Sequence, residues 1–157
     1  MNYWVAVLFL LSLVLVGGCS SQPVMYYGRL VDGLRETGAT VEPKGNTEQP
    51  AFPELFSGTS KAIKFNVENL VVWEYGGEAV AEAETGFISR DGFELMGPSD
   101  SKDGSLTVNV GWIAPPHWYQ AGRIIVLYVG ENQKTLDLLE NLLGTQFAGH
   151  GPARAAE

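Results

Sequence analysis

Thiols and imidazoles are scarce in this chain of 157 residues, which contains one cysteine, Cys19, and two histidines. A single cysteine cannot form an internal disulfide, so the hydrophobic core alone must stabilise the fold. Basic residues are also few, since ten Lys and Arg stand against 18 Asp and Glu, and the net charge is −8. Binding to nucleic acid and adsorption to an anionic lipid surface both depend on clustered basic side chains. The composition therefore argues against both of these partners.

The chain also lacks the signatures of common catalytic sites. His150 lies in a polar C-terminal stretch, so a Ser-His-Asp system would have to use His117, and no serine stands in a Gly-x-Ser-x-Gly context. No Gly-rich phosphate loop with a following Lys is present. Residues 100–104 place a lysine where a calcium loop needs an oxygen ligand. We therefore predict no catalytic residue, no metal and no cofactor.

The one long apolar run lies near the N-terminus. Residues 3–16 carry no charged side chain and lead into Val16-Gly17-Gly18-Cys19. This run is shorter than the roughly 20 apolar residues of a membrane-spanning helix, but it has the length of the apolar part of a signal peptide. An aliphatic residue, two small residues and a cysteine form the pattern of a bacterial lipobox, in which the cysteine thiol receives the lipid.

The lipobox predicts how the chain is organised. We expect a signal peptide over residues 1–18, a lipidated Cys19 with a tether over 19–24, one domain over 25–148 and a disordered tail over 149–157. The lipid would anchor the domain to the extracytoplasmic side of a membrane in the bacterial cell envelope, so a membrane is its predicted partner. Residues 1–2 carry no Lys or Arg. An uncleaved anchor helix and simple secretion are therefore open alternatives. Whether the membrane is the inner or the outer one also stays open.

Hydrophobic periodicity predicts the elements of the domain. Apolar residues at helical spacing predict helices over residues 25–37, 78–88 and 132–144. Alternating or continuous β-branched runs predict strands over 40–42, 62–67, 70–75, 106–110 and 123–129, and residues 89–104 are predicted to form a loop. Because a hairpin followed by a helix occurs twice, we predict an α+β fold. It would have a mostly antiparallel sheet of about five strands with helices packed on one face.

Residues 112–119 join two predicted strands and are unusually rich in aromatic residues. Two prolines in this segment argue against a continuous strand. One interpretation is a binding surface for an envelope protein or a small molecule, and the other is a rigid crossover whose aromatic side chains cover the sheet. The candidate surface residues are Trp112, Pro115, Pro116, His117, Trp118 and Tyr119.

Four stretches of the chain resemble a family of small uncharacterised bacterial proteins, many of which are lipoproteins. The stretches are Trp-Glu-Tyr at 73–75, Trp-Ile-Ala-Pro-Pro-His-Trp-Tyr at 112–119, Gly-Arg-Ile-Ile-Val-Leu-Tyr-Val-Gly at 122–130 and Leu-Leu-Gly-Thr-Gln-Phe-Ala-Gly at 142–149. The likeness covers most of residues 30–149, and Ala-Pro-Pro-His and Gly-Arg are its most specific parts. The resemblance supports the predicted architecture and implies no activity.

Two hypotheses about function follow. The favoured one is a non-catalytic binding or scaffold module, anchored in the envelope by the lipid on Cys19. The alternative is a small envelope hydrolase that uses His117. An enzyme needs His117 in a cleft beside a serine or carboxylate. A binding or structural role allows this histidine to be buried.

Overall fold

The computed structural model describes residues 23–46, 52, 55–98 and 104–149. The predicted signal peptide, Cys19 and residues 150–157 of the predicted disordered tail lie outside the described residues. The described chain contains, in order, α1 (Tyr27–Glu36), β1 (Val41–Asn46), β2 (Thr59–Phe65), β3 (Glu68–Glu74), α2 (Glu78–Thr85), β4 (Glu94–Pro98), β5 (Ser105–Asn109), β6 (Pro116–Ala121), β7 (Ile124–Val129), α3 (Gln133–Leu143) and β8 (Ala148–Gly149).

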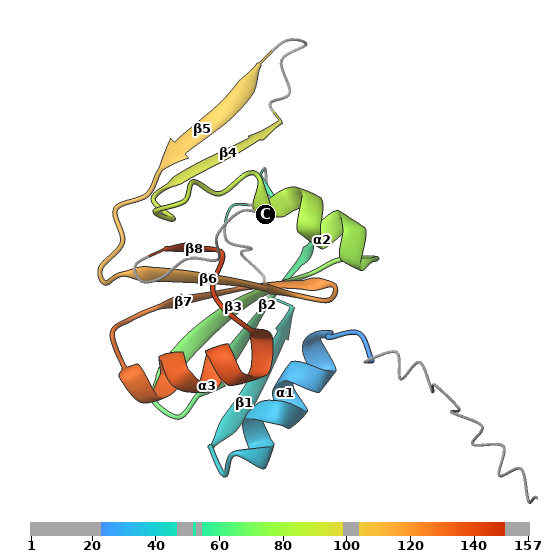
Figure 1. Cartoon of the computed structure of the whole chain (residues 1–157), viewed down its shortest axis with the longest axis vertical. Coiled ribbons are helices and arrows are strands. Elements are labelled where there is room, and N and C mark those ends of the chain that lie inside the picture. Colours follow the sequence, from blue (N-terminus) through green and yellow to red (C-terminus); the bar gives the residue numbers. More distant parts are fainter. Residues whose placement is uncertain (1–22, 47–51, 53–54, 99–103, 150–157) are drawn as a thin grey trace, which may run out of the picture.

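Six strands form one antiparallel sheet in the order β1-β2-β3-β7-β6-β8, and β4 and β5 form a separate two-stranded sheet (Figure 1). β7 lies between β3 and β6, which agrees with its continuous apolar run, because a central strand has both faces covered. The side chains of Ile124–Tyr128 are all buried. The predicted fold class is confirmed, since the described chain is an α+β structure with a mostly antiparallel sheet.

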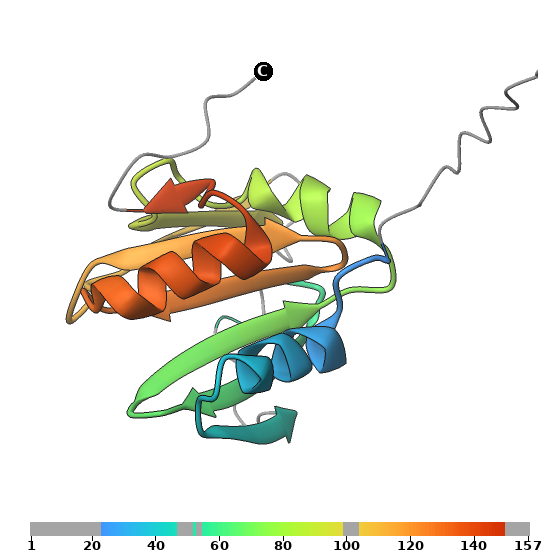
Figure 2. The same ribbon diagram turned by 60° about the horizontal axis from the view of Figure 1, so that its bottom comes forward.

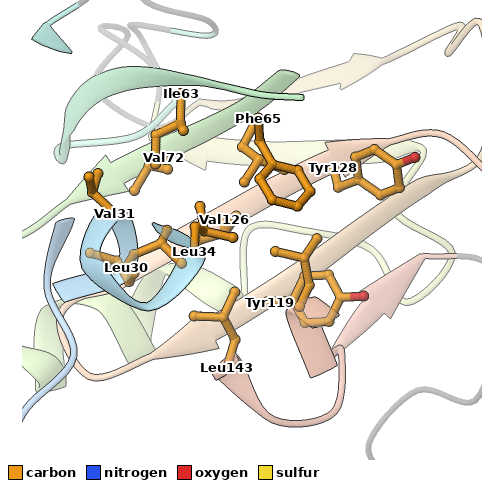
Figure 3. Packing of buried hydrophobic residues seen from close by; sticks show 13 residues of the cluster. Leu30, Val31, Leu34, Ile63, Phe65, Val72, Tyr119, Val126, Tyr128 and Leu143 are labelled. Atoms are coloured by element: carbon orange, nitrogen blue, oxygen red, sulfur yellow. The ribbon is translucent and has the colours of Figure 1, made fainter. Parts of the chain in front are cut away.

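One hydrophobic core lies between the sheet and the two helices α1 and α3, which cover the same face (Figure 2). Figure 3 shows Leu30 and Leu34 of α1 pointing toward Val126 of the central strand. Both leucines are fully buried, and each such burial contributes about 2 kcal/mol. The sheet side chains in this core are Ile63, Phe65, Leu70, Val72, Tyr119, Ile124, Val126 and Tyr128.

A second core lies on the opposite face of the sheet, under α2 and the β4–β5 hairpin. Trp73, Trp118, Ile125 and Leu127 supply its sheet side. The segment that precedes β2 helps to close this core, since Leu55 and Phe56 are buried there. Central strands therefore alternate large apolar side chains toward both cores.

The second helix departs from the predicted arrangement of helices on one face. α2 packs against the face opposite to α1 and α3, through Ala81. The physical reason is that β3 and β7 place apolar side chains on both faces, so each face needs a cover. Helical periodicity identifies the buried stripe of a helix but does not say which face of the sheet receives it.

The strands predicted over 106–110 and 123–129 do not pair with each other as a second hairpin. β5 pairs with β4, which lies within the predicted loop at 89–104, and β6 pairs with β7. β6 begins at Pro116, so residues 116–119 belong to a strand and not to a crossover loop. Proline is tolerated there because it is the first residue of the strand. Gly149, predicted as part of the tail, pairs with His117 in β8.

Candidate functional site

The six residues of the candidate surface do not lie on one surface. Pro116, His117, Trp118 and Tyr119 are buried, while Trp112 and Pro115 are half-buried. Successive residues of β6 point to opposite faces of the sheet, so Trp118 enters the core under α2 and Tyr119 the core under α1 and α3. This placement favours the interpretation of the segment as part of the architecture.

His117 is held by hydrogen bonds at both ring nitrogens. Its Nδ1 lies 2.7 Å from Oε1 of Gln146, and its Nε2 lies 3.0 Å from the carbonyl oxygen of Gly130. The Tyr128 ring stacks beside it with a centroid distance of 6.0 Å. Neither of these two hydrogen-bond partners is a serine or a carboxylate. This geometry ties the end of β7 to the segment before β8, and it leaves neither ring nitrogen available to a substrate.

Gly92 holds two indoles of the second core. Its carbonyl oxygen accepts hydrogen bonds from Nε1 of Trp112 at 2.9 Å and from Nε1 of Trp118 at 3.4 Å. Gly92 has a φ of +77°, and a Cβ there would lie 2.9 Å from the Trp118 ring. Only glycine suits this position, because it combines a left-handed backbone with close approach. The sequence gives no signal for this pairing beyond a glycine in a loop.

A buried carboxylate on α2 binds the segment before β2. Glu84 is buried, and its carboxylate accepts hydrogen bonds from Ser57 N at 3.1 and 3.2 Å and from Ser57 Oγ. The hydroxyl of Tyr75 is buried without a hydrogen-bond partner among the described residues. Burial and the neighbouring Glu84 carboxylate raise the pKa of Tyr75. The Glu84 carboxylate therefore fixes the segment before β2 to α2.

Glu74 lies at the centre of a second polar cluster, where β3 ends. Its carboxylate pairs with Lys61 and with Arg123, whose Nη2 lies 3.0 Å from Oε1, and accepts a hydrogen bond from Tyr27 N at 3.3 Å. Burial opposes the charge, yet the hydrogen bonds and cations around Glu74 hold its pKa below the ordinary value. The cluster thus fixes the start of α1 to the sheet.

A shallow groove of about 360 Å³ lies between the end of α1 and the start of α3. Asn66 and Asn132 line it, and both side chains already bond to the protein, Asn66 Oδ1 to Thr40 N and Asn132 Oδ1 to Lys134 N. Within the described residues, no group of three or more His, Cys, Asp and Glu is arranged to hold a metal ion. The groove therefore shows no built ligand site.

The outer edge of β5 presents backbone groups that no described strand pairs with. Leu95 pairs with Val108 and Gly97 with Leu106, and Val110 N bonds to Phe93 O in the same ladder. By the alternation of antiparallel pairing, the N–H and C=O groups of Ser105, Thr107 and Asn109 point away from β4. In the described part of the chain, β4 is the only strand that pairs with β5.

The two edges of the β1–β2 and β4–β5 pairs differ in their protection. β1, at the edge of the main sheet, contains Pro43 and Lys44 and a register irregularity between Pro43 and Gly45. These features discourage pairing with another strand. No charged residue occurs between residues 104 and 122, so β5 carries no such protection. Among the described strands of these two pairs, β5 is the one suited to strand addition.

Comparisons with family models, with curated proteins and with solved structures found no match to this chain. The resemblance to small bacterial lipoproteins therefore stays a prediction. In the part of the chain that the structure describes, no helix has the length and apolar character needed to cross a membrane.

Proposed function

We propose that the protein is a lipid-anchored, non-catalytic binding module on the extracytoplasmic side of a bacterial membrane. The observation that carries the non-catalytic part is the environment of His117. Both of its ring nitrogens are hydrogen-bonded inside the protein, to Gln146 and Gly130. A general base needs a free nitrogen within reach of the proton that it removes. The anchoring part rests on the lipobox that ends at Cys19.

The hydrolase alternative has little geometric support. Ser57, the serine bonded to a buried carboxylate, bonds to Glu84 and not to His117. The Glu84 carboxylate binds both the Ser57 amide and its hydroxyl, which is a loop-fixing arrangement. The alternative assigns the base to His117, whose ring nitrogens bond to Gln146 and Gly130 and not to Ser57 or Glu84.

We assign partner binding to the β4–β5 hairpin, which projects from the α2 side of the sheet (Figure 1). The N–H and C=O groups of three β5 residues, Ser105, Thr107 and Asn109, point away from β4. An extended peptide could pair with these groups as an added strand. The partner would be a segment of another envelope protein, uncharged where it pairs because β5 is itself uncharged. Main-chain hydrogen bonds would supply affinity, and exposed side chains such as Met96 would supply contact area.

The anchor is tested by Cys19→Ser in cells that carry the full chain. We expect the wild type to incorporate radiolabelled palmitate and to fractionate with membranes. The variant should incorporate none and stay uncleaved or mislocalised. Ser20→Ala, one residue further, is the matched control and should behave as the wild type. A Cys19→Ser protein that migrates and fractionates as the wild type does would disprove the anchor.

The binding edge is tested by site-specific photo-crosslinking from position 96 in intact cells. We expect one adduct, whose identity is fixed by mass spectrometry. Thr107→Pro should abolish it, because proline removes the outward N–H without removing a bond to β4. Thr107→Ala keeps that N–H and should retain the adduct. Adducts that survive Thr107→Pro, or a dimer of the chain itself, would contradict strand addition by a different protein.

A further inference from the structure

The segment that leads from the predicted anchor into the domain is fixed to the sheet. Arg123 N bonds to Met25 O at 3.0 Å, and Arg29 Nη1 bonds to Pro23 O at 2.9 Å. A Cβ on Gly122 would lie 2.5 Å from both Met25 N and Met25 O, so this segment lies directly against the β6–β7 turn. Hydrogen bonds thus hold the chain to the domain from Pro23 onward.

The predicted tether between Cys19 and Pro23 is short. Four residue steps span at most about 14 Å when fully extended. If Cys19 carries the lipid, the surface around Pro23 must stay within that distance of the membrane. The opposite end of β3, where Val67 lies in the turn, is about 20 Å further away along the strand.

The surface beside Pro23 has the composition of a membrane-interface contact. Val24 is 50 % exposed and Tyr26 is 41 % exposed. The Arg123 guanidinium lies 5.4 Å from the centroid of the Tyr26 ring. Aromatic rings and arginines are favoured at the headgroup level, where an apolar body and a polar end are both accommodated. Glu74, at the end of β3, is already paired with Lys61 and Arg123, and the exposed Glu78 at the start of α2 carries a negative charge at the same end of β3.

We propose that Val24, Tyr26, Arg29 and Arg123 form a surface that contacts the lipid bilayer and orients the domain on it. This proposal rests on the proposed lipid anchor. The end of the sheet where β3 finishes and β6 turns into β7 would then face the membrane. The net charge of −8 opposes adsorption of the domain as a whole. The anchor therefore supplies the attachment, and this surface supplies the orientation.

The test uses the protein from Cys19 onward, coupled through its single thiol to a maleimide lipid in phosphatidylcholine nanodiscs. A paramagnetic lipid in the same discs broadens the amide signals of residues that approach the headgroups. We expect the strongest broadening at Val24, Tyr26 and residues 121–123, several-fold above that at Val67. Because the coupling is chemical, this result does not depend on whether cells acylate Cys19. Palmitate labelling tests that question separately.

A lengthened tether separates a true contact from mere proximity. About ten Gly and Ser residues inserted after Ser21 let the domain rotate freely. We expect the broadening pattern to persist in this protein and to be lost when Val24→Ser and Tyr26→Ser are added. Val67→Ser, at a more exposed aliphatic site far from the tether, is the control and should leave the pattern unchanged.

Equal melting temperatures of these proteins would show that the substitutions act on the surface and not on folding. If the double variant melts lower, Val24→Asp alone replaces it. Uniform broadening with the long tether, or strongest broadening at another face, would overturn the proposed surface. It would leave the lipid anchor untouched.

Discussion

Trp73 and Trp118 stack against each other from strands that are not neighbours, with ring centroids 5.6 Å apart and planes at 23°. β7 lies between their strands, and it pairs Ile125 with Trp73 and Leu127 with Trp118. Phe56 covers the pair, with its centroid 4.9 Å from that of Trp73. The aromatic segment of β6 is thus tied to β3 and to the segment before β2.

This stack predicts that Trp118→Ala destabilises the domain strongly. Trp118 is fully buried, and truncation of a buried Trp costs about 3 to 5 kcal/mol because a cavity is left behind. Urea denaturation followed by circular dichroism measures the loss. Ile113→Ala is the control, since Ile113 is 100 % exposed, and it should change the free energy of unfolding by less than about 0.5 kcal/mol. A Trp118→Ala protein as stable as the wild type would restore the binding interpretation of this segment.

Strong local patterns predicted most of the fold. Asn132 caps α3 through a bond from Lys134 N to its side chain, and Gly144 ends the helix with a φ of +84°, so these residues lie at the two bounds of the helix predicted over 132–144. The alternation around β2 and β3 predicts their hairpin, and the continuous apolar run of β7 predicts its central place. Such patterns are set by neighbouring residues, so they are readable without tertiary information.

The sequence does not predict which strands pair with each other. The residue pattern of β5 fits pairing with β7 as well as with β4. β4 contains Gly97 and Pro98, which are typical of loops, so the sequence does not predict a strand there. Gly97 is needed because a Cβ there would lie 2.8 Å from the Leu55 side chain. The burial of His117 depends in the same way on Gln146, 29 residues away. Long-range contacts decide these features, and single residues give no sign of them.

The central position of β7 predicts that a charged side chain on either face of this strand prevents folding. Ile125 and Val126 are both fully buried, one in each core. A buried unpaired carboxylate costs several kcal/mol, which is comparable to the total stability of a domain. Ile125→Asp and Val126→Asp should therefore each abolish the cooperative unfolding transition. Val67→Asp, at a site that is 84 % exposed, should retain it. Cooperative unfolding of both core variants would remove β7 from the core.

Substitutions of two buried polar residues on the α2 side, Glu84 and Tyr75, should have opposite effects on the free energy of unfolding. Glu84→Ala should lower the free energy of unfolding by about 2 kcal/mol, because the Ser57 amide and hydroxyl lose a charged acceptor. Tyr75→Phe removes a hydroxyl that has no partner among the described residues, so stability should stay equal or rise by up to about 1 kcal/mol. Chemical denaturation of both variants measures this. Marked destabilisation by Tyr75→Phe would show that its hydroxyl is bonded in solution.

The Glu74 cluster predicts a specific pH dependence. The pKa of Glu74 is lowered in the folded protein from its ordinary value of 4.5, so its contribution to stability is present above that value and is lost as the pH falls through the folded pKa. Glu74→Gln should therefore cost about 2 kcal/mol at pH 7, where the charged hydrogen bonds are intact. At acidic pH, below the ordinary value of 4.5, the cost should shrink as the pH approaches and passes the lowered pKa of folded Glu74. Glu82→Gln, exposed on α2, is the control and should cost little at either pH. Urea titrations of the three proteins at both pH values give these differences directly.

A cost of Glu74→Gln that does not change with pH would mean that the carboxylate acts through its shape and neutral hydrogen bonds and not through its charge.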